Sequence, residues 1–363
     1  MTSAMEQLAA RGQSVWLDYI RRDMLQNGDM AAMVADGLRG MTSNPSIFEK
    51  SIAGSDQYDE DIATFVAANA SATPIEIFEH LAIEDIKSAA DILAPVYERT
   101  DGADGFVSLE VSPHLADDTD GTTAEARRLW AAVGRPNVMI KVPATPAGIR
   151  AIETLIGENI NVNVTLMFSM DDYEAVSHAY LRGIEKASDP SRVASVASFF
   201  VSRVDTAVDM HLAELGEAGA ALLGQVAIAN AKVTYQRYLE LFGDDFEAEW
   251  GKGAFPQRLL WASTGTKNPA YSDLMYVEGL IGDNTVNTLP PATLDAFADH
   301  GSAAEVALVA EVEDAYAVLD KLAAVGVDLD SITDKLQRDG VQAFIDAFEA
   351  LLGAIEDKRS ALV

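Results

Sequence analysis

A single lysine interrupts an otherwise apolar segment of this chain. Residues 137–144 read NVMIKVPA, and Lys141 follows the alternating Val138 and Ile140 of a predicted buried strand. An ammonium group inside such a strand costs several kcal/mol unless it is paired or loses its charge. Burial disfavours the charged form, and an uncharged lysine amine attacks carbonyl carbons. Lys141 is therefore either a Schiff-base nucleophile, or a lysine that reaches the rim or pairs with a carboxylate.

Eight apolar segments of strand length alternate with amphipathic segments of helix length, which predicts a parallel sheet closed into a (β/α)₈ barrel. The predicted strands are 14–20, 38–44, 105–111, 137–142, 160–168, 193–201, 258–263 and 284–289. The rival architecture is a doubly wound open sheet. Such a sheet usually carries a glycine-rich phosphate loop, and neither G-x-G-x-x-G nor G-x-x-x-x-G-K-[ST] occurs in the sequence.

Several predicted strands have one apolar face and one face that carries polar atoms. In a barrel the apolar face meets the surrounding helices, so the mixed face is expected to point inward. Most of its polar residues lie in the C-terminal half of their strand, at the end where barrel enzymes build their sites. The inward polar residues predicted in this way are Asp18, Asn44, Glu110, Lys141, Asn163, Thr165, Ser198 and Ser263.

These residue types fit the chemistry of a lysine Schiff base. An amine that condenses with a ketone needs an acid to expel the carbinolamine hydroxyl, and a base when a carbon–carbon bond breaks. Asp18 and Glu110 are the only carboxylates on the predicted inner faces. Four more residues there can orient sugar hydroxyls or, alternatively, hold strand-end backbone in turns: Asn44, Asn163, Thr165 and Ser198.

Composition narrows the classes of partner. The chain of 363 residues carries 57 acidic and 26 basic residues, a formal charge of −31, which disfavours nucleic acid and anionic membranes as partners. We find no transmembrane segment and no signal peptide in the sequence. The absence of cysteine excludes disulfides and thiolate metal sites and fits a cytoplasmic protein. A phosphorylated substrate would need local positive charge against this acidic background.

We expect a single domain over 1–363, with the barrel at about 14–300 and a C-terminal helical extension at about 301–363. Ser3 and Glu6 stand at the spacing of a capping box and predict an N-terminal helix. Beyond residue 300 the pattern is purely helical, and Gly326 and Gly340 are predicted to end helices there. These helices are expected to pack on the barrel or on a partner subunit.

Seven segments, in the same order along the chain, resemble the transaldolases. These are class I, Schiff-base enzymes of the pentose phosphate pathway, and the C-terminal region resembles their longer bacterial members. The resemblance implies a (β/α)₈ barrel with an additional N-terminal helix and C-terminal helices. The segments are WLDYI (16–20), GMTSNPSIF (40–48), VSLEVSP (107–113), IKVPATPAGIRAI (140–152), INVNVTLMFS (160–169), SFFVSRVD (198–205) and ASTGTKN (262–268).

The resemblance assigns the central chemistry to four residues. It implies that Lys141 forms the Schiff base and that Asp18 shuttles the hydroxyl proton as acid and base. Glu110 and Thr165 would hold the catalytic water between them. Three further residues would surround the three-carbon dihydroxyacetone unit, with Asn44 and Asn163 binding it and Ser198 lining its pocket.

The same resemblance also assigns the residues that would bind the substrate phosphate. Arg203 matches the phosphate-binding position, and Ser263 is carried over with it. Many relatives have a second arginine where this chain has Gly265, so Lys267 is the nearest cation. Phe200 matches a tyrosine of the related fructose 6-phosphate aldolases; a phenyl ring offers no hydroxyl to protonate the enamine, which favours transfer over cleavage.

The resemblance implies transfer of dihydroxyacetone from sedoheptulose 7-phosphate or fructose 6-phosphate to glyceraldehyde 3-phosphate or erythrose 4-phosphate. No metal and no cofactor are expected, because the protonated imine is itself the electron sink. Two alternatives stay open: an aldolase that releases free dihydroxyacetone, and a non-catalytic barrel that binds sugar phosphates with Lys141 as a charge partner of Glu110. The sequence is compatible with a monomer or a homodimer.

Overall fold

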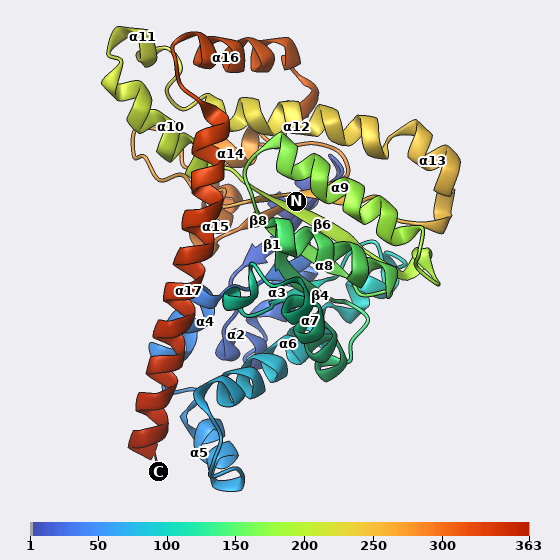
Figure 1. Cartoon of the computed structure of the whole chain (residues 1–363), viewed down its shortest axis with the longest axis vertical. Coiled ribbons are helices and arrows are strands. Elements are labelled where there is room, and N and C mark those ends of the chain that lie inside the picture. The colour runs from blue at the N-terminus through green and yellow to red at the C-terminus, as the bar shows by residue number, and fades with distance from the viewer. Residues whose placement is uncertain (1–2, 363) are drawn as a thin grey trace.

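Eight parallel strands close into a barrel in the computed structural model, which describes residues 3–362 (Figure 1). Strand β1 pairs with both β2 and β8, so the sheet has no edge. The predicted closed barrel is confirmed, and every strand lies within two residues of its predicted ends. The strands are β1 (Gln13–Asp18), β2 (Gly40–Thr42), β3 (Val107–Glu110), β4 (Val138–Pro143), β5 (Val162–Met167), β6 (Ser195–Phe200), β7 (Arg258–Ala262) and β8 (Thr285–Leu289).

Helices surround the barrel and bury the aliphatic outer faces of its strands, such as Val107, Leu109 and Ile140. The helices that follow the strands include α4 (Pro45–Ala53), α6 (Pro74–Arg99), α7 (Thr119–Val133), α8 (Pro146–Gly157), α9 (Met170–Ile184), α10 (Ser202–Glu214), α12 (Val226–Phe242) and α15 (Pro291–His300). Shorter or peripheral helices are α1 (Ala4–Ala9), α2 (Arg22–Gln26), α3 (Asp29–Ala35), α5 (Asp59–Ala68), α11 (Glu217–Ala220), α13 (Asp244–Trp250), α14 (Met275–Glu278), α16 (Val312–Ala324) and α17 (Leu329–Leu362).

Side-chain caps fix the chain where strands turn into helices. Asn44 caps α4, with its Oδ1 accepting a hydrogen bond of 3.0 Å from the Ile47 N–H. Thr145 and Ser169 cap α8 and α9 in the same way, after β4 and β5. The predicted capping box of Ser3 and Glu6 is also present, at the start of α1. The caps after β2, β4 and β5 hold three helix N-termini at the C-terminal end of the barrel.

The C-terminal helix differs from the sequence-based expectation. Gly326 follows α16 with a positive φ of 84°, as predicted for a helix end. The prediction that Gly340 ends a helix is wrong, because α17 runs through it. A Cβ at Gly340 would lie 2.9 Å from Leu166 Cδ2, so glycine here allows the helix to approach the end of β5 closely.

The long helix α17 runs along one side of the molecule and its lower end lies beside α5 (Figure 1). Its Gln337 amide donates hydrogen bonds to the carbonyl oxygens of Ala144, at 3.1 Å, and Leu166, at 3.2 Å. At its far end, the Lys358 ammonium pairs with Asp59 at 2.6 Å. The helix is therefore fixed both at the C-terminal end of the barrel and at α5.

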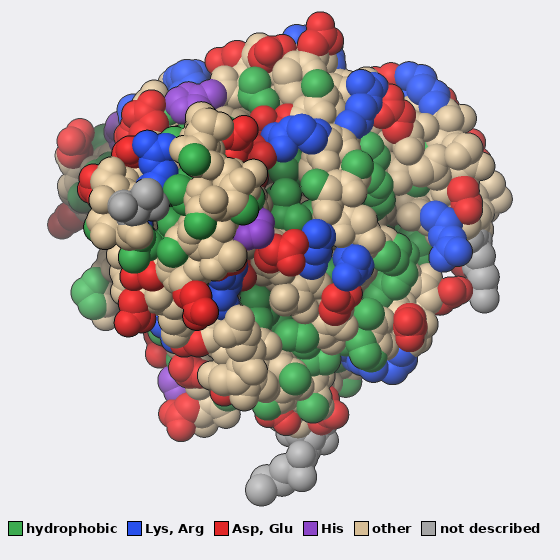
Figure 2. Space-filling view, turned by 90° about the horizontal axis from the view of Figure 1, so that it is seen from below, with side chains coloured by type: hydrophobic (Ala, Val, Ile, Leu, Met, Phe, Trp, Pro, Cys, Tyr) green, Lys and Arg blue, Asp and Glu red, His purple; other side chains and the backbone are tan. Residues whose placement is uncertain are grey.

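Charged side chains of both signs cover the surface. Carboxylates are scattered over the face in Figure 2, with lysines and arginines between them. Many of these cations are paired, as in Arg128–Glu79 and Arg135–Asp91, both at 2.6 Å. Within residues 3–362, none of the helices has an apolar stretch long enough to cross a bilayer.

Two glycines of α17 provide a matched test of how the helix is seated. Gly340→Val is expected to destabilise the protein by about 1–3 kcal/mol, because the added side chain meets Leu166. Gly353→Ala is expected to stabilise it by about 0.5–1 kcal/mol, since a Cβ there meets nothing within 4 Å and alanine favours helix. Urea unfolding of both variants measures the difference, and a stabilising Gly340→Val would contradict the close seating.

Candidate active site

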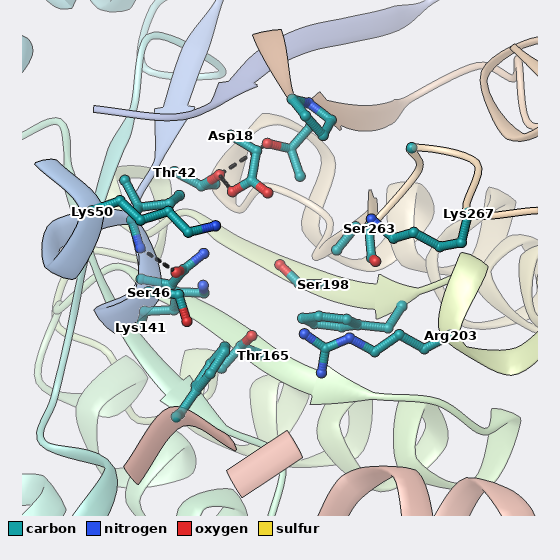
Figure 3. Close-up of a pocket in the computed structure, with 18 residues that line it drawn as sticks. Asp18, Thr42, Ser46, Lys50, Lys141, Thr165, Ser198, Arg203, Ser263 and Lys267 are labelled. Carbon is teal, nitrogen blue, oxygen red and sulfur yellow. Dashed lines mark hydrogen bonds between the residues drawn. The ribbon is translucent and has the colours of Figure 1, made fainter. Parts of the chain in front are cut away.

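A cavity of about 270 Å³ opens at the C-terminal ends of the strands (Figure 3). Nine of the sequence-predicted site residues line it: Asp18, Asn44, Lys141, Thr165, Ser198, Phe200, Arg203, Ser263 and Lys267. The two others, Glu110 and Asn163, do not line the cavity but contact residues that do. The structure therefore brings all eleven predicted residues together at one end of the barrel.

Lys141 lies at the centre of this arrangement. Its side chain is only 6 % exposed, and its Nζ donates a hydrogen bond of 3.1 Å to the carbonyl oxygen of Ser43. Nζ also lies 3.4 Å from Oε2 of Glu110, at the distance of an ion pair. The strand register explains this contact, since Glu110, Lys141 and Asn163 stand side by side across β3, β4 and β5.

Glu110 is a buried carboxyl group suited to exchange protons near neutral pH. Burial raises the pKa of Glu110 to about 7, although the charge of Lys141 acts in the opposite direction. Its Oε2 accepts no hydrogen bond within the described chain, and neither does the buried Oγ1 of Thr165. Each unsatisfied oxygen costs about 1–3 kcal/mol, so water or a substrate hydroxyl is expected to bind there.

Asp18 faces the cavity from the end of β1. Its Oδ1 accepts a hydrogen bond of 2.8 Å from Thr42 Oγ1, which in turn lies 2.9 Å from Thr288 Oγ1 (Figure 3). Burial raises the pKa of Asp18, while Lys141 and the Thr42 hydrogen bond lower it. Thr42 and Thr288 were missed in the sequence, although both lie in the C-terminal half of a predicted strand.

Asn163 lies beside Lys141 inside the barrel and connects neighbouring strands by hydrogen bonds. Its Nδ2 donates to Ser108 Oγ at 2.9 Å, and its Oδ1 accepts from Ser198 Oγ at 2.7 Å. Asn163 is fully buried and lies outside the cavity lining, so contact with substrate stays a prediction for this residue. Asn44 uses its Oδ1 as a helix cap, which leaves its Nδ2 available to the cavity.

Three cations line the cavity without a carboxylate partner. Lys50, Arg203 and Lys267 form no ion pair and no side-chain hydrogen bond within residues 3–362, whereas most other described cations do. The Arg203 guanidinium lies 5.0 Å from the centre of the Phe200 ring, and burial lowers the pKa of Arg203 while attraction to Asp18 raises it. Such unpaired cations can bind an anion such as phosphate.

Lys50 was not singled out in the sequence. It lies on α4, on the opposite side of the cavity from Arg203 and Lys267 (Figure 3). Nothing in its local pattern distinguishes it from a solvated lysine on a helix. Phe344 was also missed; it belongs to α17 and reaches the cavity only because that helix packs across the barrel end.

The chain is similar to known proteins over nearly its whole length. A family model described as transaldolase/fructose-6-phosphate aldolase matches residues 15–355. A protein named transaldolase from Thiobacillus denitrificans is 50% identical over 351 residues, covering 95% of this chain and 97% of its own. A transaldolase from Trichodesmium erythraeum is 44% identical, and the match covers 99% of this chain and 98% of that protein. A transaldolase from Mycolicibacterium paratuberculosis is 46% identical, and the match covers 95% of this chain and 94% of that protein.

The raised pKa of Glu110 predicts a pH-dependent stability that Glu110→Gln removes. A folded-state pKa near 7, against 4.5 in the unfolded chain, means that the folded state binds this proton more tightly. The associated stability is complete below pH 4.5 and is lost as the pH rises through 7. Relative to Glu110→Gln, the unmodified chain should lose roughly 3 kcal/mol at most between these limits.

Urea unfolding of the two proteins at several pH values measures this difference. A difference in unfolding free energy that stays constant from pH 4.5 to 8 would contradict a raised pKa at Glu110.

Proposed function

Because the chain belongs to the transaldolase/fructose-6-phosphate aldolase family, we propose that it transfers a dihydroxyacetone unit between sugar phosphates through a Schiff base on Lys141. The donor is sedoheptulose 7-phosphate or fructose 6-phosphate, and the acceptor is glyceraldehyde 3-phosphate or erythrose 4-phosphate, as in the non-oxidative pentose phosphate pathway. The observation that carries the proposal is the buried Lys141 amine, 3.4 Å from a carboxyl group in a cavity with unpaired cations.

Binding would begin with the substrate phosphate. Arg203, Lys267 and the Ser263 hydroxyl share one side of the cavity (Figure 3). A phosphate held there leaves the sugar chain to extend toward Lys141, with its C2 carbonyl near Nζ. The cations also offset the repulsion that a chain of net charge −31 exerts on an anionic substrate.

The Schiff base would form in two steps. Lys141 Nζ attacks C2 of the ketose, and the carbinolamine then loses its hydroxyl as water with a proton supplied from the Glu110 side. The unsatisfied oxygens of Glu110 and Thr165 support this role, because both can hold the departing water. The protonated imine then withdraws electrons from the neighbouring carbon–carbon bond.

Bond cleavage and transfer would share one acid/base group. Asp18 takes the proton of the C4 hydroxyl, the C3–C4 bond breaks, and an aldose leaves behind a three-carbon enamine on Lys141. The raised pKa of Asp18 and its hydrogen bond from Thr42 suit a carboxyl group that both accepts and returns this proton. When an acceptor aldehyde arrives, C3 attacks its carbonyl carbon and Asp18 protonates the resulting alkoxide oxygen. Water then adds to C2 of the imine, and the product leaves Lys141.

Borohydride trapping tests the Schiff base. Incubation with fructose 6-phosphate followed by reduction is expected to add a three-carbon unit to the unmodified chain, and Lys141→Met is expected to show no adduct. Adding erythrose 4-phosphate before the borohydride should lower the amount of adduct, because this sugar accepts the three-carbon unit. Intact-protein mass spectrometry measures all three results.

The outcome also separates the alternatives. Absence of an adduct on the unmodified chain would favour a barrel that only binds sugar phosphates. An adduct that releases free dihydroxyacetone quickly without an acceptor would favour an aldolase.

Arg203→Gln tests the phosphate side of the cavity. Loss of a charged hydrogen bond worth about 1.5–3 kcal/mol is expected to raise KM for fructose 6-phosphate about 10- to 150-fold. Slow turnover of unphosphorylated fructose should stay unchanged, because that sugar has no phosphate for Arg203 to bind. Equal losses with both sugars in steady-state assays would argue against Arg203 as the phosphate ligand.

A further inference from the structure

Phe344 places an aromatic ring over the proposed nucleophile. The centre of the ring lies 5.7 Å from Lys141 Nζ, and the side chain is only 4% exposed. Phe344 lines the same cavity as Asp18 and Lys141, although it comes from the C-terminal helix and not from the barrel. A three-carbon unit bound to Nζ would therefore fill the space between the nitrogen and the ring.

The structure fixes this ring by three contacts on the preceding two turns of α17. Gln337 bonds the carbonyl oxygens of Ala144 and Leu166, and Gly340 allows close approach to the Leu166 side chain. Leu166 itself has a positive φ of 59°, at a register shift between β5 and β6. The neighbours of Leu166 hold its backbone in this strained conformation. In this conformation its carbonyl oxygen accepts the hydrogen bond from Gln337.

A second phenylalanine ring lines the same cavity. Phe200 also lines the cavity, and neither ring carries a group that can donate a proton. The Phe344 ring occupies space beside Lys141, and the Phe200 ring occupies space beside Arg203. A unit bound to Nζ would therefore be shielded from bulk water on the side of α17.

The enamine on Lys141 has two fates that differ in what reaches C3. In transfer, the electron pair of C3 forms a bond to an aldehyde carbon, and the aldehyde oxygen takes a proton. In release, a proton from water bonds to C3 instead and regenerates the iminium. Water then adds to C2, and the lysine amine leaves to give free dihydroxyacetone.

We propose that Phe344 determines this partition: its ring covers the enamine against protonation by bulk water and so favours transfer over release. The inference rests on the proposed Schiff-base function and goes beyond it, because it assigns a specificity-determining role to a residue of the C-terminal helix. Phe344 would touch the bound three-carbon unit through its ring face.

The test compares release with transfer in full-length variants. Each protein receives fructose 6-phosphate in D₂O, first without and then with erythrose 4-phosphate, and free deuterated dihydroxyacetone is measured by NMR. Phe344→Ala is expected to raise the ratio of release to transfer by about tenfold, which corresponds to about 1.4 kcal/mol in relative barrier height. Phe344→Leu keeps a smaller apolar cover and should lie in between.

Phe348→Ala is the matched control. Phe348 is one turn further along α17, is 3% exposed, and packs against Phe78 without lining the main cavity. It should lower the melting temperature about as much as Phe344→Ala but leave the ratio of release to transfer unchanged.

The outcomes distinguish this inference from the function on which it rests. A borohydride adduct on Phe344→Ala with an unchanged ratio would overturn the role of Phe344 and leave the Schiff base intact. An equal rise in Phe348→Ala would also overturn it, because a loosened helix would then account for the release. If the unmodified chain forms no adduct, the proposed function fails and the inference fails with it.

Discussion

The structure depends on one constraint: a lysine side chain has to lie inside a barrel. The register of three adjacent strands places Lys141 between Glu110 and Asn163, at the level where the interior changes from packed side chains to an open cavity. Glu110 offsets the buried charge at 3.4 Å, and burial brings the pKa of Glu110 to about 7. Asn163, held by Ser108 and Ser198, keeps the neighbouring strands in place. A single register thus places a buried amine, a buried carboxyl group and the amide that supports them side by side.

The negative net charge of the protein opposes the binding of an anionic substrate in the cavity. At a net charge of −31, most described cations are engaged by carboxylates or carbonyl oxygens, yet Lys50, Arg203 and Lys267 remain unpaired around the same cavity. Cations around one cavity repel one another, and a bound anion offsets this repulsion. Their placement on two sides of the cavity, with Asp18 and Lys141 also in its lining, fits a phosphorylated sugar (Figure 3).

Much of this arrangement could be predicted from the sequence, because apolar and polar residues alternate along the strands. Alternation separated the inner from the outer faces, and the polar inner positions near strand ends gave Asp18, Glu110, Lys141 and Thr165. Contacts between distant segments could not be predicted. Gly340 was expected to end a helix, since nothing local shows that α17 needs a small residue against Leu166. Phe344 was missed for the same reason: its position over Lys141 depends on how a helix some two hundred residues later in the chain packs on the barrel.

The proposed function requires a covalent bond between Lys141 and the sugar, and a crystal structure of the borohydride-reduced complex with fructose 6-phosphate tests this bond most directly. We expect continuous electron density from Nζ to C2 of a three-carbon unit, with the Phe344 ring against that unit. A water molecule should lie between Glu110 Oε2 and Thr165 Oγ1, two buried oxygens that accept no hydrogen bond within the described chain. An intact sugar bound without a covalent link, with Lys141 still paired to Glu110, would contradict the Schiff-base function.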